Sequence, residues 1–194
     1  MGWSTITALL FAIIGAGTLV LWQKGYTRVY TNVHDYSWWW LPVSLAIALV
    51  LHETYYYWLH RWMHQPAIFR IVHKVHHDSN ITSPWTAFSF HPLEGLLQAL
   101  FLPLLMLFLP MHLYVVIVQL TIMTLSSVIN HLDIEIYPKH FYKHILGKWL
   151  IGATHHALHH KQFKYNYGLY FTFWINGSIP KARPTPNYLM KKPY

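Results

Sequence analysis

Long apolar stretches alternate with short polar segments along this chain of 194 residues. Four apolar stretches each approach the roughly 20 residues that a helix needs to cross a bilayer core of about 30 Å. They cover residues 4–22, 38–59, 93–109 and 111–129. Pro110 separates the last two, and because proline disrupts a helix interior, we expect it at the tip of a hairpin. The pattern predicts an all-α integral membrane protein with four transmembrane helices in two hairpins.

The polar segments that follow these stretches, 60–91 and 130–174, contain most of the histidines. If these histidines share metal ions, both segments must lie on one side of the membrane, and the predicted hairpin permits this. Only Lys24 and Arg28 lie in the loop after the first stretch, whereas the histidine-rich segments carry Arg61, Arg70, Lys74, Lys139, Lys143, Lys148, Lys161 and Lys164. Because basic residues favour the cytoplasmic side, we expect a cytosolic helical cap, including a short amphipathic helix at 68–77.

The composition supports a membrane protein. Hydrophobic residues make up 54% of the chain and charged residues only 10%, against about 25% in ordinary soluble domains. We expect a single domain at 1–178, followed by a basic, proline-rich tail at 179–194. The absence of cysteine excludes disulfides, iron–sulfur ligands and a thiol nucleophile. The net charge of +8 fits a cytoplasmic membrane face, and without a nucleic-acid-binding motif we expect no nucleic-acid partner.

Half of the sixteen histidines fall into three clusters with helical spacing. One cluster is an H-x3-H pair and the other two share the spacing H-x2-H-H: they comprise His60 and His64, then His73, His76 and His77, then His156, His159 and His160. Residues four apart lie on one face of a helix, so two imidazoles can bind one ion. Neutral imidazole binds iron, zinc and copper. The clusters therefore predict a metal centre with many histidine ligands.

The number of imidazoles indicates more than one ion. Eight exceed the four ligands of one tetrahedral zinc, so two metal ions fit better. Acids near the clusters are scarce, which argues against a carboxylate-bridged di-iron bundle, and the H-E-x-x-H motif of zinc proteases is absent. An all-nitrogen dinuclear centre at a membrane surface faces a pool of apolar molecules. We therefore expect oxidation of unactivated C–H bonds in lipids, with O2 as co-substrate.

Motifs around the clusters resemble those of the fatty acid hydroxylase and sterol desaturase superfamily. The resemblance covers roughly residues 51–174 and includes E-x3-Y-x2-H-R-x2-H from Glu53, H-K-V-H-H from His73 and F-H-P-L-E from Phe90. Asn130-His131 is also similar, and so is the last histidine cluster, or box, which is followed by N-Y-G and F-T-F-W. In the final motif, Ile175 replaces the usual aspartate. The resemblance implies a four-helix membrane fold with a cytosolic di-iron site. It also implies an external electron donor, of ferredoxin or cytochrome b5 type, and a sterol, fatty acyl or related lipid that is hydroxylated or desaturated.

The resemblance also implies a ligand set and two supporting residues. The implied metal ligands are His60, His64, His73, His76, His77, His91, His131, His156, His159 and His160, with His91 either a ligand or a neighbour of one. Two iron ions are implied, although imidazole also binds zinc. A bare charge near the metal end of a membrane helix is costly, so we expect Glu53 to orient a ligand histidine. Arg61 is expected to pair with Glu53 or with a lipid phosphate.

The remaining histidines carry weaker predictions. His140 and His144 lie among lysines and favour an interfacial basic helix, and His155 is expected to point away from the last box. His34 and His112 are expected to be structural or solvent-facing. The same holds for His52, but it also lies two helical turns before His60 and could line a substrate path, which we expect between the second and fourth apolar helices.

Two other functions remain open. Carotenoid hydroxylases are similarly small and rich in histidine, but their first box usually reads H-x4-H, whereas this chain has H-x3-H. A non-catalytic metal-binding or transport protein would place histidines and acids along a path within the helices. Here the clusters gather at one face. Desaturases of the acyl-CoA type are longer, and their boxes are spaced differently.

Overall fold

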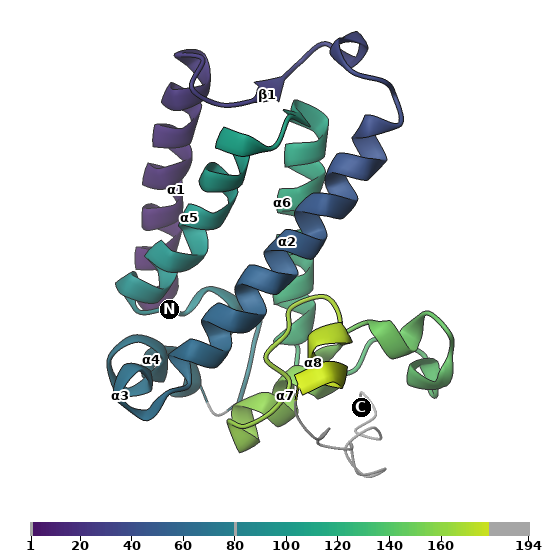
Figure 1. Cartoon of the computed structure of the whole chain (residues 1–194). Coiled ribbons are helices and arrows are strands. Elements are labelled where there is room, and N and C mark those ends of the chain that lie inside the picture. Colours follow the sequence, from purple (N-terminus) through teal and green to yellow (C-terminus); the bar gives the residue numbers. More distant parts are fainter. Residues whose placement is uncertain (1, 80, 179–194) are drawn as a thin grey trace.

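The computed structural model describes residues 2–79 and 81–178, which are mostly helical. Four long helices form a bundle (Figure 1): α1 (Gly2–Gln23), α2 (Trp40–Met63), α5 (Pro92–Phe108) and α6 (Leu113–Asn130). They correspond to the four predicted apolar stretches, although α2 continues past residue 59 and thereby carries His60 out of the bundle. The predicted tail at 179–194 lies outside the described residues.

Proline and histidine determine where α5 and α6 begin. Pro92 occupies the first turn of α5, where its missing N–H would have no helical partner. The side chains of His91 and His112 each accept a hydrogen bond from a backbone N–H two residues later, and so cap α5 and α6. Pro110 separates the two helices, as predicted, and its carbonyl accepts a hydrogen bond from the Trp40 indole at 2.9 Å. The helices therefore form the expected hairpin.

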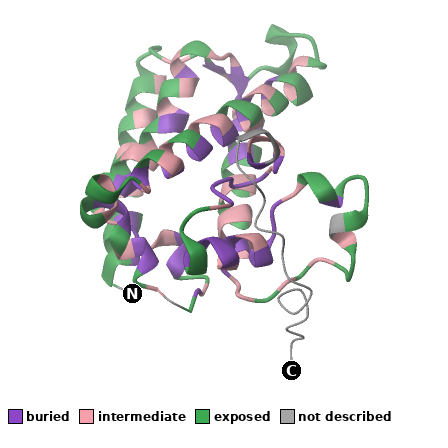
Figure 2. Cartoon of the chain, turned by 60° about the horizontal axis from the view of Figure 1, so that its bottom comes forward, coloured by how far each residue is buried: buried purple, intermediate pink, exposed green. Residues whose placement is uncertain are grey.

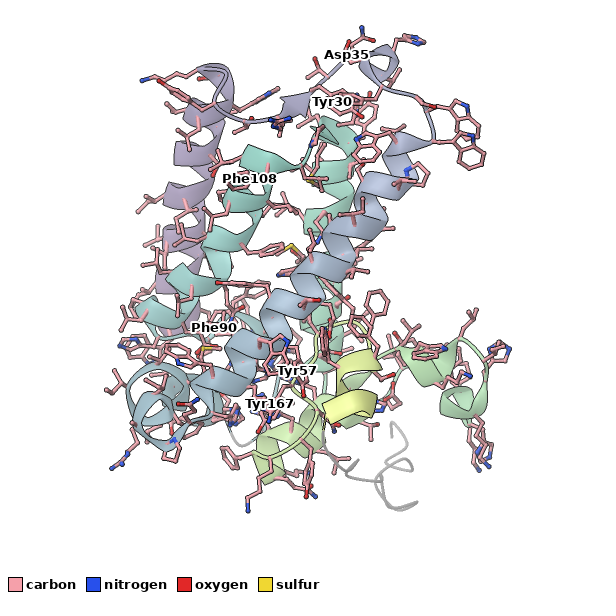
Figure 3. All side chains as sticks on the ribbon, in the orientation of Figure 1. Tyr30, Asp35, Tyr57, Phe90, Phe108 and Tyr167 are labelled. Atoms are coloured by element: carbon pink, nitrogen blue, oxygen red, sulfur yellow. The ribbon has the colours of Figure 1, made fainter. Side chains whose placement is uncertain are left out.

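A short parallel pairing closes the end of the bundle that lies farthest from the predicted metal ligands. Strand β1 (Val29–Tyr30), in the loop after α1, pairs with β2 (Met111–His112), at the turn of the hairpin. The 3-10 turn η1 (Val33–Asp35) follows, and Figure 3 labels Asp35 at this end. The pairing ties the loop between α1 and α2 to the α5–α6 hairpin.

Short helices and turns form a cap at the opposite end of the bundle (Figure 1). They are α3 (Pro66–Ile68), η2 (Phe69–His73), α4 (Lys74–His77), η3 (Thr86–Phe88), η4 (Phe141–Lys143), η5 (Gly147–Trp149), α7 (Ala153–Gln162) and α8 (Phe173–Ser178). The helix predicted at 68–77 is present but interrupted, because η2 is a π-helical turn. Such turns insert one extra residue and occur frequently at functional sites.

The outer surface of the bundle is apolar. Leu9, Ile13 and Phe108 are 61%, 70% and 75% exposed, and Figure 2 shows exposed residues along the outer faces of the long helices. In the described chain, α1 and α6 are long and apolar enough to cross a membrane, and α5 is apolar but shorter. Large exposed apolar surfaces are rare on soluble monomers. This surface supports association with a membrane.

Candidate metal centre

Nine histidines from four separate parts of the chain converge where the cap meets the bundle. Their ring nitrogens form two groups, and within each group the candidate ligand atoms lie within 4.8 Å of one another. The first group contains His60, His64, His73, His77 and His159, and the second contains His76, His131, His156 and His160. The groups are neighbours, because the ring centres of His77 and His160 are 4.4 Å apart.

Local structure explains how each element contributes. The last turns of α2 place His60 and His64 on one face, four residues apart. In the segment η2–α4, His73 and His77 also share a face and join the first group, while His76 points to the second. Helix α7 divides its box in the opposite way: His156 and His160 join the second group and His159 the first. The C-cap of α6 supplies His131.

The distances between ring nitrogens match those around a metal ion. In the first group, Nε2 of His64, His77 and His159 lie 3.0–3.2 Å apart. In the second, Nε2 of His131 lies 2.9 Å from that of His156 and 3.3 Å from that of His76. Nitrogens about 2.0–2.1 Å from one ion lie about 2.8–3.4 Å apart along the edge of an octahedron or tetrahedron.

The protonation of the rings also fits a cation. Nδ1 of His60, His159 and His131 hydrogen bonds to the backbone carbonyls of Tyr167, Tyr165 and Ser127 at 2.9, 2.6 and 2.7 Å, respectively. Because a carbonyl only accepts, Nδ1 carries the proton and Nε2 keeps a lone pair directed into the group. Converging lone pairs repel one another unless a cation lies between them. The donor set therefore fits a metal ion in each group.

A carboxylate orients one of these histidines. Nδ1 of His73 lies 2.8 Å from Oε1 of Glu94, which is fully buried at the start of α5, and Gln98 also donates a hydrogen bond to this oxygen. The buried Nε2 atoms of His60 and His73 have no hydrogen-bond partner among the described residues. A carboxylate behind a metal-binding histidine fixes its orientation and increases the basicity of the ligand nitrogen. The F-H-P-L-E motif includes Glu94, but the sequence predicted no role for this residue.

Glu53 has a different role from the predicted one. Its carboxylate accepts hydrogen bonds from the backbone N–H groups of Leu169 and Tyr170, the latter at 2.7 Å. The prediction that it contacts a ligand histidine is wrong; it holds the loop whose Tyr167 carbonyl orients His60. Figure 3 shows Tyr167 beside Tyr57 of α2, where this loop meets the bundle.

Two of the predicted contacts, the ion pair between Arg61 and Glu53 and metal ligation by His91, are not formed among the described residues. Arg61 lies over the Trp58 ring, 5.4 Å from its centre, rather than beside Glu53. His91 lies outside both groups, because its ring caps α5 and lies 6.1 Å from the Trp3 ring. His155 lies outside the groups, as predicted: its Nδ1 accepts a hydrogen bond from the Gly152 N–H at the start of α7.

The other cap histidines lie in irregular structure. His144 accepts a hydrogen bond from the Leu146 N–H and His140 has a left-handed backbone with φ of 67°, so the interfacial helix predicted there is replaced by the short turns η4 and η5. Neither residue belongs to the two histidine groups.

Burial keeps the clustered imidazoles neutral. Removal from water lowers the pKa of His131 to about 4 and that of His159 to about 3. The pKa values of His76, His77 and His156 also fall well below the ordinary value, first because of burial and then because of the neighbouring histidines. At neutral pH these rings are therefore uncharged, which is the state that binds a metal ion.

An apolar cavity of about 360 Å³ lies inside the bundle, and two of its lining residues, Phe90 and Tyr56, pack against histidines of the two groups. Its walls come mainly from α1, α5 and α6, so it does not lie simply between the second and fourth apolar helices as expected. At its inner end, the ring of Phe90 lies 5.2 Å from that of His76, and the ring of Tyr56 lies 5.3 Å from that of His60. His52, which was expected to be structural or solvent-facing but could also line a substrate path, is buried and lines this cavity.

The fold and the histidine groups define a helical, membrane-associated protein with a candidate dinuclear metal centre beside an apolar cavity. Residues 45–175 match the family model for fatty acid hydroxylase. The chain belongs to this family, within the fatty acid hydroxylase and sterol desaturase superfamily.

Curated relatives include sterol-modifying enzymes. A Delta(7)-sterol 5(6)-desaturase of Gibberella zeae is 32% identical, over 84% of this chain and 49% of its own length. Lathosterol oxidase of Mus musculus is 33% identical, over 90% of this chain and 58% of its own length. The chain thus spans about half the length of the curated relatives it matches. No solved structure matches it.

Proposed function

We propose that this chain is an O2-dependent oxidoreductase that hydroxylates or desaturates a lipid bound in the apolar cavity. The observation that supports this proposal best is the convergence of nine histidines, distant in sequence, into two groups that pack against the cavity-lining residues Phe90 and Tyr56. A metal transporter would instead need polar groups along a path through the helices, whereas the cavity lining is largely apolar.

The two histidine groups would each hold one iron ion. Iron bound there would supply the redox chemistry with O2 that side chains lack and that zinc, which has no redox chemistry, cannot provide. Desaturation removes two hydrogen atoms from the lipid. Together with O2, two electrons and two protons, these hydrogens form two water molecules. An external electron donor, a ferredoxin or cytochrome b5 type protein, is therefore part of the proposal.

Backbone and side-chain groups of this protein prepare the site in three ways. The carbonyls of Tyr167, Tyr165 and Ser127 fix which ring nitrogen of each histidine faces inward. The buried Glu94 carboxylate does the same for His73. Phe90, which is 5% exposed, covers the second group on the cavity side, so water is excluded where the lipid would lie.

The proposed membrane arrangement has all four long helices spanning the bilayer, with the cap in the cytoplasm. Helix α2 carries the buried polar residues His52 and Glu53, but its outward residues, such as Val50 and Leu51, are 49% and 44% exposed and apolar. The basic residues at the cap end and the small number in the α1–α2 loop support the cytoplasmic position.

Sterols are the first substrate class to test, because the relatives named above are sterol desaturases and lathosterol oxidases. The test uses purified protein in lipid nanodiscs with ferrous iron, an electron donor, O2 and lathosterol. We expect iron-dependent formation of a product that mass spectrometry identifies as two mass units lighter, or as carrying one added oxygen atom. His156→Ala should abolish this reaction, whereas His144→Ala, outside both groups, should retain it. Iron-loaded protein that yields no oxidised lipid and no lipid-dependent O2 consumption with sterol or acyl substrates would contradict the proposal.

A further inference from the structure

The cavity is elongated along the bundle. On α6 its lining residues run from Leu113 to Ser127, which corresponds to about 20 Å at 1.5 Å per residue. The outer end is lined by Trp22, Val29 and Leu113, near the β1–β2 pairing. The inner end reaches Phe90, beside the second histidine group. This shape suits a long, narrow molecule that lies parallel to the helices.

The polar lining of the cavity is concentrated in its inner half. His52, Gln98, Thr124 and Ser127 all line this part, whereas Thr18 is the polar side chain on the outer part of α1. The Thr18 hydroxyl already donates a hydrogen bond to the carbonyl of Ile14 at 2.8 Å, within its own helix. A ligand that matches this lining has an apolar outer portion and a polar group toward the cap.

His52 is the best-positioned of these polar groups to bind a ligand. The residue is only 4% exposed, and its ring is stacked on Phe101, with ring centres 4.7 Å apart. Nδ1 forms a hydrogen bond with the Tyr170 hydroxyl at 2.6 Å, and this hydroxyl is the partner that the described residues provide for the ring. The described residues provide no hydrogen-bond partner for Nε2, so this nitrogen of a cavity-lining residue remains for a ligand.

We infer that His52, held by Tyr170, is a specificity-determining residue that hydrogen bonds to the hydroxyl group of a rod-shaped lipid alcohol of the sterol class. A hydroxyl both donates and accepts, so it satisfies Nε2 in either tautomer of the His52–Tyr170 pair. The hydroxyl-bearing end of the ligand then lies toward the cap and its apolar end near Trp22. This inference rests on the proposed function, because it takes the cavity as the substrate site.

The test measures equilibrium binding to iron-loaded protein in nanodiscs without O2, so that no turnover occurs. The probes are lathosterol and its 3-deoxy analogue, which differ by one hydroxyl group. We expect the wild-type protein to bind the alcohol about tenfold or more tightly, because the analogue leaves Nε2 unpaired. His52→Phe, which keeps an aromatic ring against Phe101, should reduce this ratio to about one. Tyr170→Phe, which removes a single oxygen, should lower the ratio as well.

Thr18→Val is the matched control, because it removes a polar group from the outer part of the same cavity and should leave the ratio unchanged. An undiminished ratio in both His52→Phe and Tyr170→Phe, or no preference in the wild-type protein, would overturn the inference. If His52→Phe does not fold, Tyr170→Phe alone decides. A His52-dependent preference without oxidation after O2 and electrons are added would refute the proposed function but support the binding site.

Discussion

Each H-x2-H-H box divides its side chains between the two histidine groups. In the η2–α4 segment, His73 and His77 belong to the first group and His76 to the second. Residues four apart share a helix face, while the neighbour of the last residue points about 100° away, so one helical turn supplies both groups. Neighbouring histidines should therefore have separable effects on metal content.

This division leads to a prediction for single substitutions. His77→Ala should weaken the first group and His76→Ala the second, so each variant should lose about one of the two proposed iron ions rather than both. Metal analysis of purified protein, together with the spectroscopic signature of the remaining iron, measures the effect. His144→Ala should retain both ions, since it lies outside the groups. Loss of all metal in both variants, with the fold intact, would show that the two groups do not bind independently.

At the residue scale, spacing predicted which histidines lie together but not what surrounds them. The eight histidines of the three boxes all lie in the two groups, because their spacing is a local property of helices. The position of His91 depends on the cap of α5, and the partners of Glu53 and Glu94 depend on long-range packing. No spacing rule reveals that Glu94, rather than Glu53, contacts a histidine.

At the element scale, the loop after α7 supports both ends of the first group. Its Tyr165 and Tyr167 carbonyls orient His159 and His60, and Glu53 holds the loop through backbone N–H groups. Gly168 lies between these contacts. A Cβ atom at this position would lie 2.5 Å from Oε1 of Glu53, closer than real Cβ atoms approach their neighbours.

We therefore expect Gly168→Ala to displace the loop from α2. The change should lower the free energy of unfolding by about 2 kcal/mol or more, as overpacking in a closed site does. Bound iron should fall as well, because two ligand histidines lose their orienting carbonyls. Thermal unfolding and metal analysis check both effects. Gly17→Ala is the control, since no atom lies within 4 Å of its added Cβ and its stability should change little; equal behaviour of the two variants would contradict this account of the loop.

The long helices were predictable from hydropathy, whereas the cap was only partly so. The four apolar stretches match α1, α2, α5 and α6 within a few residues, because about 20 apolar residues in sequence strongly favour a helix. The π turn η2 and the turns η4 and η5 have no comparable signal. Their backbone depends on contacts with distant segments, such as the bridge between Leu150 and Phe171.

At the scale of the whole molecule, many buried neutral imidazoles make the fold sensitive to acid. His131 and His159 have pKa values of about 4 and about 3 in the fold, against about 6.5 in an unfolded chain. At pH values between the pKa in the fold and the pKa in the unfolded chain, the unfolded chain binds more protons than the folded one. The free energy of unfolding therefore falls as pH drops below about 6.5. The loss approaches about 1.4 kcal/mol per group per pH unit, and stability should be constant above about pH 7.5.

The melting temperature of metal-depleted protein in detergent tests this prediction between pH 8 and pH 5. We expect a plateau at the alkaline end and a steep fall below about pH 6.5. An unchanged melting temperature down to pH 5 would mean that the histidines are not buried as the structure describes.

The proposed membrane topology leads to a labelling prediction. The chain has no cysteine, so single cysteines can be introduced without background. In intact cells, a maleimide that does not cross membranes should label Lys24→Cys in the α1–α2 loop, but should label Lys161→Cys on α7 only after the cells are permeabilised. The reverse order would place the histidine groups outside the cytoplasm, and equal labelling of both would contradict a spanning bundle.

Helix α1 forms one wall of the cavity but precedes the part of the chain that matches the family, which begins at residue 45. It is attached to the cap through the Ser4 hydroxyl, which donates to the Trp85 carbonyl, and the loop that follows it is attached to the hairpin through the Arg28 N–H, which donates to the Met106 carbonyl. Substitutions along α1 can therefore change which molecule is accepted while leaving the reactive machinery intact. One wall of the cavity thus comes from a stretch of the chain that contributes no histidine to the two groups.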